Sequence, residues 1–153
     1  MFELIKNKLI KNKLDLFRLI YAMVLGYLIS IKCKMNKNDG EIVKFRPSSE
    51  IFGIVWPILY ILLGISWIIA SRTKNKYLDI IYFILSSLLA LWIIIYSCFN
   101  NKKNAIFILL FILLSISILM ILSPQLSQLL LSPLAIWIFY ATLLNTTEVQ
   151  NLI

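Results

Sequence analysis

The side chains of this sequence that could hold a ligand are aromatic rings inside a long apolar segment. Trp56, Tyr60, Gly64 and Trp67 follow one another at i, i+4, i+8 and i+11, so they share one face of a helix. In lipid, glycine on such a face permits close helix approach, while Trp and Tyr offer ring surface with a polar group. The pattern is compatible with a wall for a flat ligand and with interfacial anchoring plus ordinary helix packing.

Residue types that catalyse reactions or bind metal ions are scarce. The sequence has no His, which removes the commonest general base and metal ligand together. Cys33 and Cys98 lack the spacing of a metal site or a catalytic pair, and we expect each to be an inert structural thiol. We therefore predict no catalytic residue, no metal ligand and no cofactor.

Composition excludes a soluble monomer. The chain has 153 residues, of which 61% are hydrophobic and 14% are charged, whereas soluble domains are about 45–50% apolar. Its net charge of +8 would favour nucleic-acid binding in a soluble protein. Here the cations lie at the ends and connections of apolar runs, where they meet anionic lipid head groups. We predict a membrane-lipid partner and no nucleic-acid partner.

The apolar runs have the length of membrane spans. A hydrocarbon core about 30 Å thick is crossed by about 20 helical residues, whose backbone polar groups are satisfied within the segment. Pro124 in the segment SPQLSQ, Ser123 to Gln128, predicts a turn that divides the longest uncharged run into two spans. The expected fold is all-α, an integral membrane five-helix bundle in one domain, 1–153, with spans at about 14–31, 51–71, 79–100, 105–122 and 128–147.

The first of these spans contains two charged residues. It crosses the membrane if Asp15 and Arg18 sit near the interface, with the Arg18 stem extending outward. A cleaved secretory signal is the alternative, but Ser30 to Cys33 does not form a suitable cleavage site. We expect an uncleaved span, so that five spans place the two termini on opposite faces of the membrane.

Orientation and the role of the longest connection stay open. The cations expected on the two faces are nearly equal in number, so the positive-inside rule gives no orientation. The connection from Lys32 to Glu50 is either a lid over a pocket or a solvated tether.

Two blocks of sequence carry a resemblance to a known family. The residues FGIVWPILY followed by LLG, Phe52 to Gly64, resemble the second helix of the TspO/MBR family, tryptophan-rich sensory proteins related to the peripheral-type benzodiazepine receptor. Upstream, Phe45 and Pro47 match the loop that precedes that helix. The block SPLAIWIFYATLLN, Ser132 to Asn145, is similar to the family's fifth helix.

The resemblance implies a membrane bundle, often dimeric, that encloses a cavity for tetrapyrroles, sterols or synthetic aromatic ligands. It suggests a multi-pass protein that binds a flat hydrophobic ligand, such as a porphyrin, and acts as a translocator, sensor or scavenger. A homodimer is a possible assembly. Phe45 and Pro47 would belong to a lid, and the ligand-binding residues implied are Trp56, Tyr60, Trp137, Ala141, Leu144 and Asn145.

The sequence departs from the family pattern at several positions. Ser48 and Glu50 stand where the family has a second proline and a tryptophan, and Trp92 and Ile95 stand where its third helix has an asparagine and, three residues later, a tryptophan. These changes motivate an alternative, a membrane scaffold or interaction protein that keeps the bundle and has lost the pocket. A third hypothesis, light-dependent porphyrin breakdown, would need tryptophans at two of these positions.

Two details of the expected site follow from helix spacing. Pro57 lies inside a span and should bend it, tilting Trp56 inward. Pro133, Trp137, Ala141 and Leu144 form one stripe of the last span. That stripe predicts a recess beside Ala141 in which a flat ligand lies against the Trp137 ring, unless Ala141 instead admits a neighbouring helix.

Overall fold

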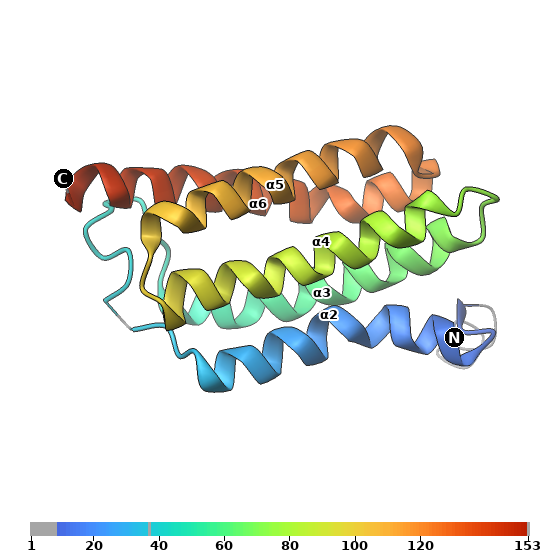
Figure 1. Cartoon of the computed structure of the whole chain (residues 1–153), viewed down its shortest axis with the longest axis horizontal. Helices are drawn as coiled ribbons and strands as arrows, with labels where there is room; N and C mark the ends of the chain where they lie inside the picture. The colour runs from blue at the N-terminus through green and yellow to red at the C-terminus, as the bar shows by residue number, and fades with distance from the viewer. Residues whose placement is uncertain (1–8, 37, 153) are drawn as a thin grey trace.

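The computed structural model describes residues 9–36 and 38–152, which are almost entirely helical (Figure 1). An α-helix satisfies its own backbone polar groups, which the apolar composition of these segments requires in lipid. The main helices are α2 (Lys13–Lys32), α3 (Ser49–Ser71), α4 (Tyr77–Ile93) with the π-helical segment η1 (Ile94–Cys98), α5 (Lys102–Leu122) and α6 (Gln125–Leu152).

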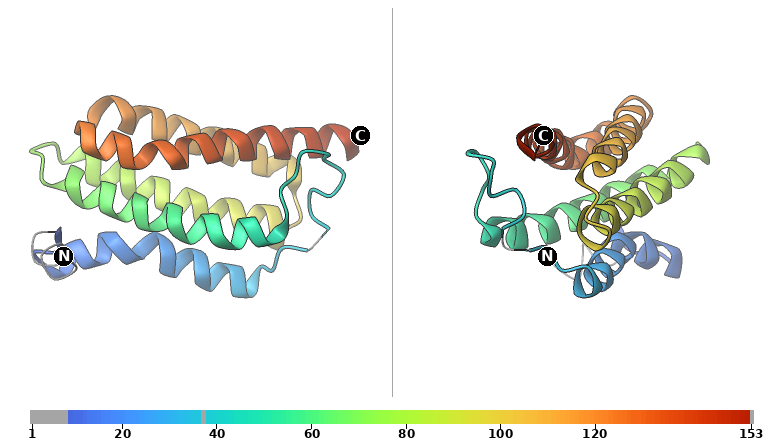
Figure 2. Two further views of the ribbon diagram at one scale, coloured as in Figure 1. Left: turned by 180° about the vertical axis from the view of Figure 1, so that it is seen from behind. Right: turned by 60° about the vertical axis from the view of Figure 1, so that its left-hand side comes forward.

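Within the described residues, five helices are long and apolar enough to cross a membrane. They run alternately up and down, so the two ends of the described chain lie at opposite ends of the bundle (Figure 1). That the termini lie on opposite faces of a membrane stays a prediction. α2 packs on α3 and α4, while α5 and α6 pack on each other and cover the other side of that pair (Figure 2). The predicted all-α five-helix bundle is confirmed.

The last helix is longer than its predicted span at both ends. α5 ends at Leu122, and the chain turns through Ser123 and Pro124 alone before α6 begins at Gln125. Proline suits the position before a helix because its missing N–H would have no partner there. The polar residues after Pro124 therefore form the first turn of α6, a shorter connection than the predicted turn.

Small side chains bring the helices close together. Ser66 of α3 and Ser127 of α6 each donate a hydroxyl hydrogen bond to the other's backbone carbonyl, at 2.8 and 3.0 Å. A Cβ atom added to Gly64 would lie only 2.6 Å from the carbonyl oxygen of Leu19 in α2. Glycine at position 64 is thus required by the distance between the α2 and α3 backbones.

Arg18 does not extend outward, and that expectation is wrong. Its side chain is buried and donates two hydrogen bonds to Asp79 of α4, from Nε at 2.9 Å and from Nη2 at 3.0 Å. Nη1 contacts Asp15 at 2.9 Å, and the indole of Trp67 donates to Asp79 at 2.7 Å. Because α4 supplies a carboxylate, the guanidinium is more stable paired within the bundle than directed to the head groups.

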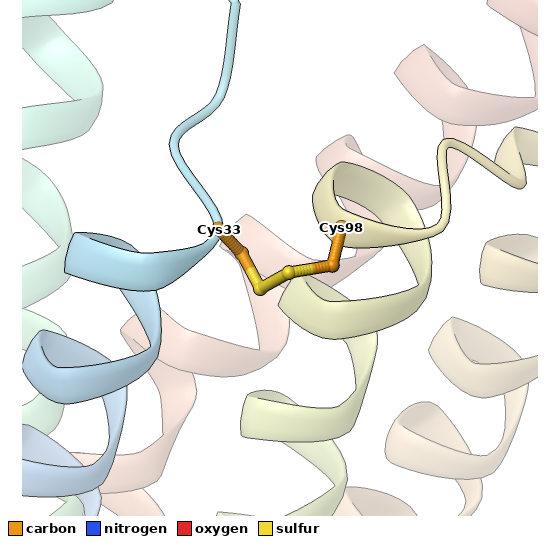
Figure 3. Close-up of a disulfide and its surroundings, with 2 residues drawn as sticks. All are labelled: Cys33 and Cys98. Carbon is orange, nitrogen blue, oxygen red and sulfur yellow. A yellow bond between two sulfur atoms is a disulfide. The ribbon is translucent and has the colours of Figure 1, made fainter.

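The two cysteines are joined, contrary to the expectation of two thiols. Cys33, which caps the end of α2, forms a disulfide with Cys98, the last residue of η1, and their Cα atoms are 4.8 Å apart (Figure 3). The bond ties α2 to the end of α4. It lies at the same end of the bundle as the 33–48 loop and the end of α6 (Figure 1).

The contact at Gly64 gives a first prediction. Gly64→Ala should lower the free energy of unfolding in detergent by about 1–3 kcal/mol, because the new methyl group must push α2 away from α3. Gly53→Ala is the matched control, since a Cβ there meets no atom within 4 Å and alanine favours the helix by up to about 1 kcal/mol. Thermal unfolding of both variants is the measurement, and equal stability of the two would contradict the close approach.

Candidate ligand-binding site

Two adjoining cavities lie at the end of the bundle that carries the 33–48 loop. The first, the loop cavity, has a volume of about 250 Å³ and is lined by that loop, α3, α4, η1 and α6. The second, the α2 cavity, has a volume of about 600 Å³ and lies between α2, α3 and α4. The surface that lines both cavities is mostly apolar, and they share Met35, Phe52 and Trp92 as walls.

The predicted ligand residues are divided between these cavities. Ala141, Leu144 and Asn145 line the loop cavity, whereas Trp56 and Tyr60 line the α2 cavity. The two groups meet across the shared Phe52 and Trp92 walls, so one ligand could touch both. That these residues bind a ligand stays a prediction.

Trp137 occupies a different place from the one its stripe suggested. Its ring is not part of either cavity wall; it packs edge-on against Phe52, with centroids 5.6 Å apart, and against Trp56, at 6.4 Å. Pro133, at the start of the stripe, is exposed. The loop cavity does form a recess beside Ala141. Trp137 is not a wall of this recess; it packs against the rings of Phe52 and Trp56.

Trp92 is the residue that sequence reasoning missed. It is 5% exposed, and its ring lies 5.9 Å from that of Trp56 and 5.3 Å from that of Tyr96. With Tyr60, 5.5 Å from Trp56, these rings form a continuous aromatic wall from the α2 cavity to the loop cavity. The pair Trp92 and Tyr96 at i and i+4 is the sequence signal that indicates this face.

Some buried polar atoms at or behind the cavity walls have no partner. Among the described residues, no hydrogen-bond partner contacts the buried indole nitrogens of Trp92 and Trp137 or the amide oxygen of Asn145. The amide nitrogen of Asn145 donates to the backbone carbonyl of Lys102 at 3.1 Å. An unsatisfied buried donor or acceptor costs about 1–3 kcal/mol, so a ligand that supplied the missing partner would bind more tightly.

The loop that closes the loop cavity is fastened by buried charges. Glu148 of α6 accepts hydrogen bonds from the Gly40 backbone N–H at 3.1 Å and from the Tyr96 hydroxyl at 2.7 Å. Lys102 pairs with Asp39 at 3.0 Å, and its ammonium lies 3.4 Å from the centre of the Tyr96 ring. The 33–48 loop is therefore held against η1, α5 and α6. A loop held in this way is compatible with a lid, whereas a solvated tether would not need these contacts.

The two predicted lid residues lie on the outer side of this loop. The Phe45 ring packs 6.1 Å from that of Tyr140, whose hydroxyl donates to the Phe45 carbonyl. Pro47 is partly buried, and neither residue lines a cavity. The residue between them, Arg46, does line the loop cavity.

Of the departures from the family pattern, Trp92 lines both cavities, whereas Ser48, Glu50 and Ile95 lie away from the cavity walls. Ser48 precedes α3 and Glu50 lies in its first turn, and both are exposed. Ile95 is partly buried against the hydrophobic core. None of the three lines either cavity, so these substitutions do not fill the pocket. Among the described residues, no three His, Cys, Asp or Glu side chains lie close enough to hold a metal ion.

Comparison with known proteins agrees with the two sequence blocks. The profile of the TspO/MBR family matches residues 19–149, which contain all five membrane-spanning helices in whole or in large part and every wall of the two cavities. A search of curated proteins gave no significant match. Nearly the whole chain thus follows the family's sequence pattern, and five of its helices can cross a bilayer. The chain belongs to the TspO/MBR family and is an integral, multi-pass membrane protein.

Proposed function

We propose that this protein binds a flat hydrophobic ligand, such as a porphyrin, in the two adjoining cavities and acts as a translocator, sensor or scavenger of it. The observation that carries the proposal is the position of Trp92, whose ring is a wall of both cavities. A flat molecule that spans them would lie along the rings from Tyr60 to Tyr96. Ring stacking favours such a ligand because it adds to the gain from burial alone.

The size and chemistry of the cavities support this proposal. Sites for small molecules have volumes of about 300–1,000 Å³, apolar walls and a few polar groups. The α2 cavity alone, at about 600 Å³, falls in this range. A saturated sterol lacks an aromatic face, so the ring-lined wall favours a conjugated planar ligand over a sterol.

Access to the α2 cavity is from the side of the bundle. Val24, Tyr27 and Leu28 line this cavity and are also exposed on the outer surface of α2. In a membrane, this surface faces lipid. A hydrophobic ligand dissolved in the bilayer therefore reaches the cavity without crossing water.

The shared wall gives a second prediction. Trp92→Leu should weaken protoporphyrin IX binding about tenfold or more, because ring stacking worth about 0.5–1.5 kcal/mol and buried area are both lost. The measurement is the change in porphyrin absorption on titration of the detergent-purified protein. Phe139→Leu is the matched control, since Phe139 is an exposed ring on α6 that lines neither cavity.

Equal losses in the two variants would contradict a site at Trp92. An unsaturable response of the unaltered protein would contradict ligand binding altogether and favour the scaffold alternative. Disappearance of the porphyrin band under illumination would instead indicate breakdown of the ligand.

A third prediction tests the loop cavity separately. Ala141→Phe should fill this cavity and abolish porphyrin binding while the melting temperature in detergent is little changed, because Ala141 faces the cavity. Ala135→Phe adds the same ring to α6 at a position that lines neither cavity. An Ala141→Phe protein that melts early yet binds porphyrin normally would show that Ala141 serves helix packing only.

A further inference from the structure

Arg46 is placed where it can meet one edge of a ligand. It is partly buried, lines the loop cavity, and its guanidinium lies 5.9 Å from the centre of the Phe52 ring. It forms no ion pair with any of the described residues. An arginine fork with no carboxylate of its own, at the edge of an apolar cavity, is suited to bind a carboxylate.

The acidic groups close to this cavity are already engaged. Asp39 also lines the loop cavity, but one carboxylate oxygen accepts from Lys102 at 3.0 Å and the other from the Asn36 backbone N–H at 3.0 Å. Glu148 is occupied by Gly40 and Tyr96. Arg46 is thus left available to a ligand.

The loop places the stem of Arg46 against the backbone of Gly40. Gly40 has φ of +74°, and a Cβ there would lie 3.2 Å from Arg46 Cδ and 3.3 Å from a methyl carbon of Leu144. The Arg46 stem therefore runs close over the Gly40 backbone, beside Leu144 of α6. Since Gly40 is held by Glu148, the Arg46 stem packs on a fixed backbone, and a side chain with fewer free rotamers loses less entropy on binding.

Two residues of the same cavity wall carry buried polar atoms without a partner. Trp92 and Asn145 both line the loop cavity and are 5% and 1% exposed, and the indole N–H and the amide oxygen have no partner among the described residues. The first needs an acceptor, and the second needs a donor. A purely hydrocarbon ligand would leave both atoms unsatisfied.

We propose that the ligand is amphipathic, with a flat conjugated body along the Trp92 wall and a carboxylate at its edge that binds Arg46. This inference rests on the proposed function and narrows its ligand class to planar acids. Arg46 is then the residue that distinguishes an acidic ligand from its uncharged ester.

The test, a fourth prediction, compares protoporphyrin IX, a diacid, with its dimethyl ester. The unaltered protein should prefer the diacid, and Arg46→Gln should lower diacid affinity about tenfold or more, as expected for loss of a hydrogen bond between charged groups. The same variant should leave ester affinity unchanged. Lys44→Gln removes a neighbouring exposed charge that lines neither cavity and should change neither affinity. Melting temperatures identify any variant that fails to fold, and Arg46→Lys, which keeps the charge, then replaces Arg46→Gln and should show a smaller loss.

The outcomes separate the two proposals. If the unaltered protein binds neither porphyrin, the proposed function is wrong. If it binds both, and Arg46→Gln weakens them equally or not at all, porphyrin binding stands and the carboxylate inference is wrong. A loss in Lys44→Gln as large as that in Arg46→Gln would show a general effect of surface charge and would also overturn the inference.

A separate observation, the disulfide, bears on membrane orientation. Cys33 and Cys98 lie at the end of the bundle that carries the 33–48 loop and the end of α6 (Figures 1 and 3). Disulfides form and persist in oxidising compartments and are rare where the cytosolic thiol pools act. The nearly balanced cations at the two ends give no competing indication.

From this bond we infer that the loop end of the bundle faces an oxidising compartment and that the N-terminal end faces the reducing cytosolic side. The loop cavity is then nearest the oxidising face. This inference is independent of any ligand.

The fifth prediction tests this orientation in acid-quenched cells. The denatured protein should react with a maleimide polymer only after reduction, then at both cysteines, whereas Cys33→Ser should react once without reduction. In right-side-out vesicles, protease should remove a C-terminal tag and spare an N-terminal one. Reaction of both thiols without reduction, or protection of the C-terminal tag, would overturn the inference.

Discussion

The loop end of this protein depends on the buried carboxylate of Glu148. A carboxylate is stable away from water only if hydrogen bonds or opposite charge compensate for its lost hydration. Here the Gly40 N–H and the Tyr96 hydroxyl supply them, one from the loop and one from η1. The requirement to satisfy one charge on α6 thus fixes a loop that is distant in sequence, and through it the mouth of the loop cavity.

The opposite end of the bundle follows the same physical rule. Arg18 is buried between Asp15 and Asp79, and Trp67 shares the Asp79 carboxylate. These contacts hold α2 in place. α2 packs on α3 and α4 and makes no extensive contact with α5 or α6. Charged groups thus determine the ends of a bundle whose middle is apolar, where dispersion and small residues govern the packing.

Sequence alone gave the helices because lipid leaves the backbone few alternatives. Long apolar runs, and Pro124 between two of them, were sufficient to place five spans. The partner of Arg18 was not predictable in this way, because Asp79 is 61 residues distant. The disulfide was missed for the same reason, since two cysteines 65 residues apart carry no local sign that their Cα atoms meet.

The candidate site was predictable in part. The resemblance indicated Ala141, Leu144 and Asn145, which share a cavity, but helix spacing could not say that Trp137 points behind the recess rather than into it. The role of Trp92 depends on how α4 is rotated against α3, which one sequence does not specify. The position of Arg46 at the loop cavity could not be predicted, because it depends on how the 33–48 loop folds over α6.

The π-helical segment Ile94–Cys98 widens the last turn of the helix that begins at Tyr77. Each α-helical residue turns the chain by about 100°, and π geometry accommodates an extra residue in a turn. Deleting one residue here would remove the extra residue and restore regular α geometry, so the hydrogen bond from the Phe99 N–H to the Ile94 carbonyl, five residues back, would be lost. The number of residues in this segment determines its backbone geometry. Replacing a side chain here changes packing alone, whereas removing a residue changes the backbone hydrogen bonds.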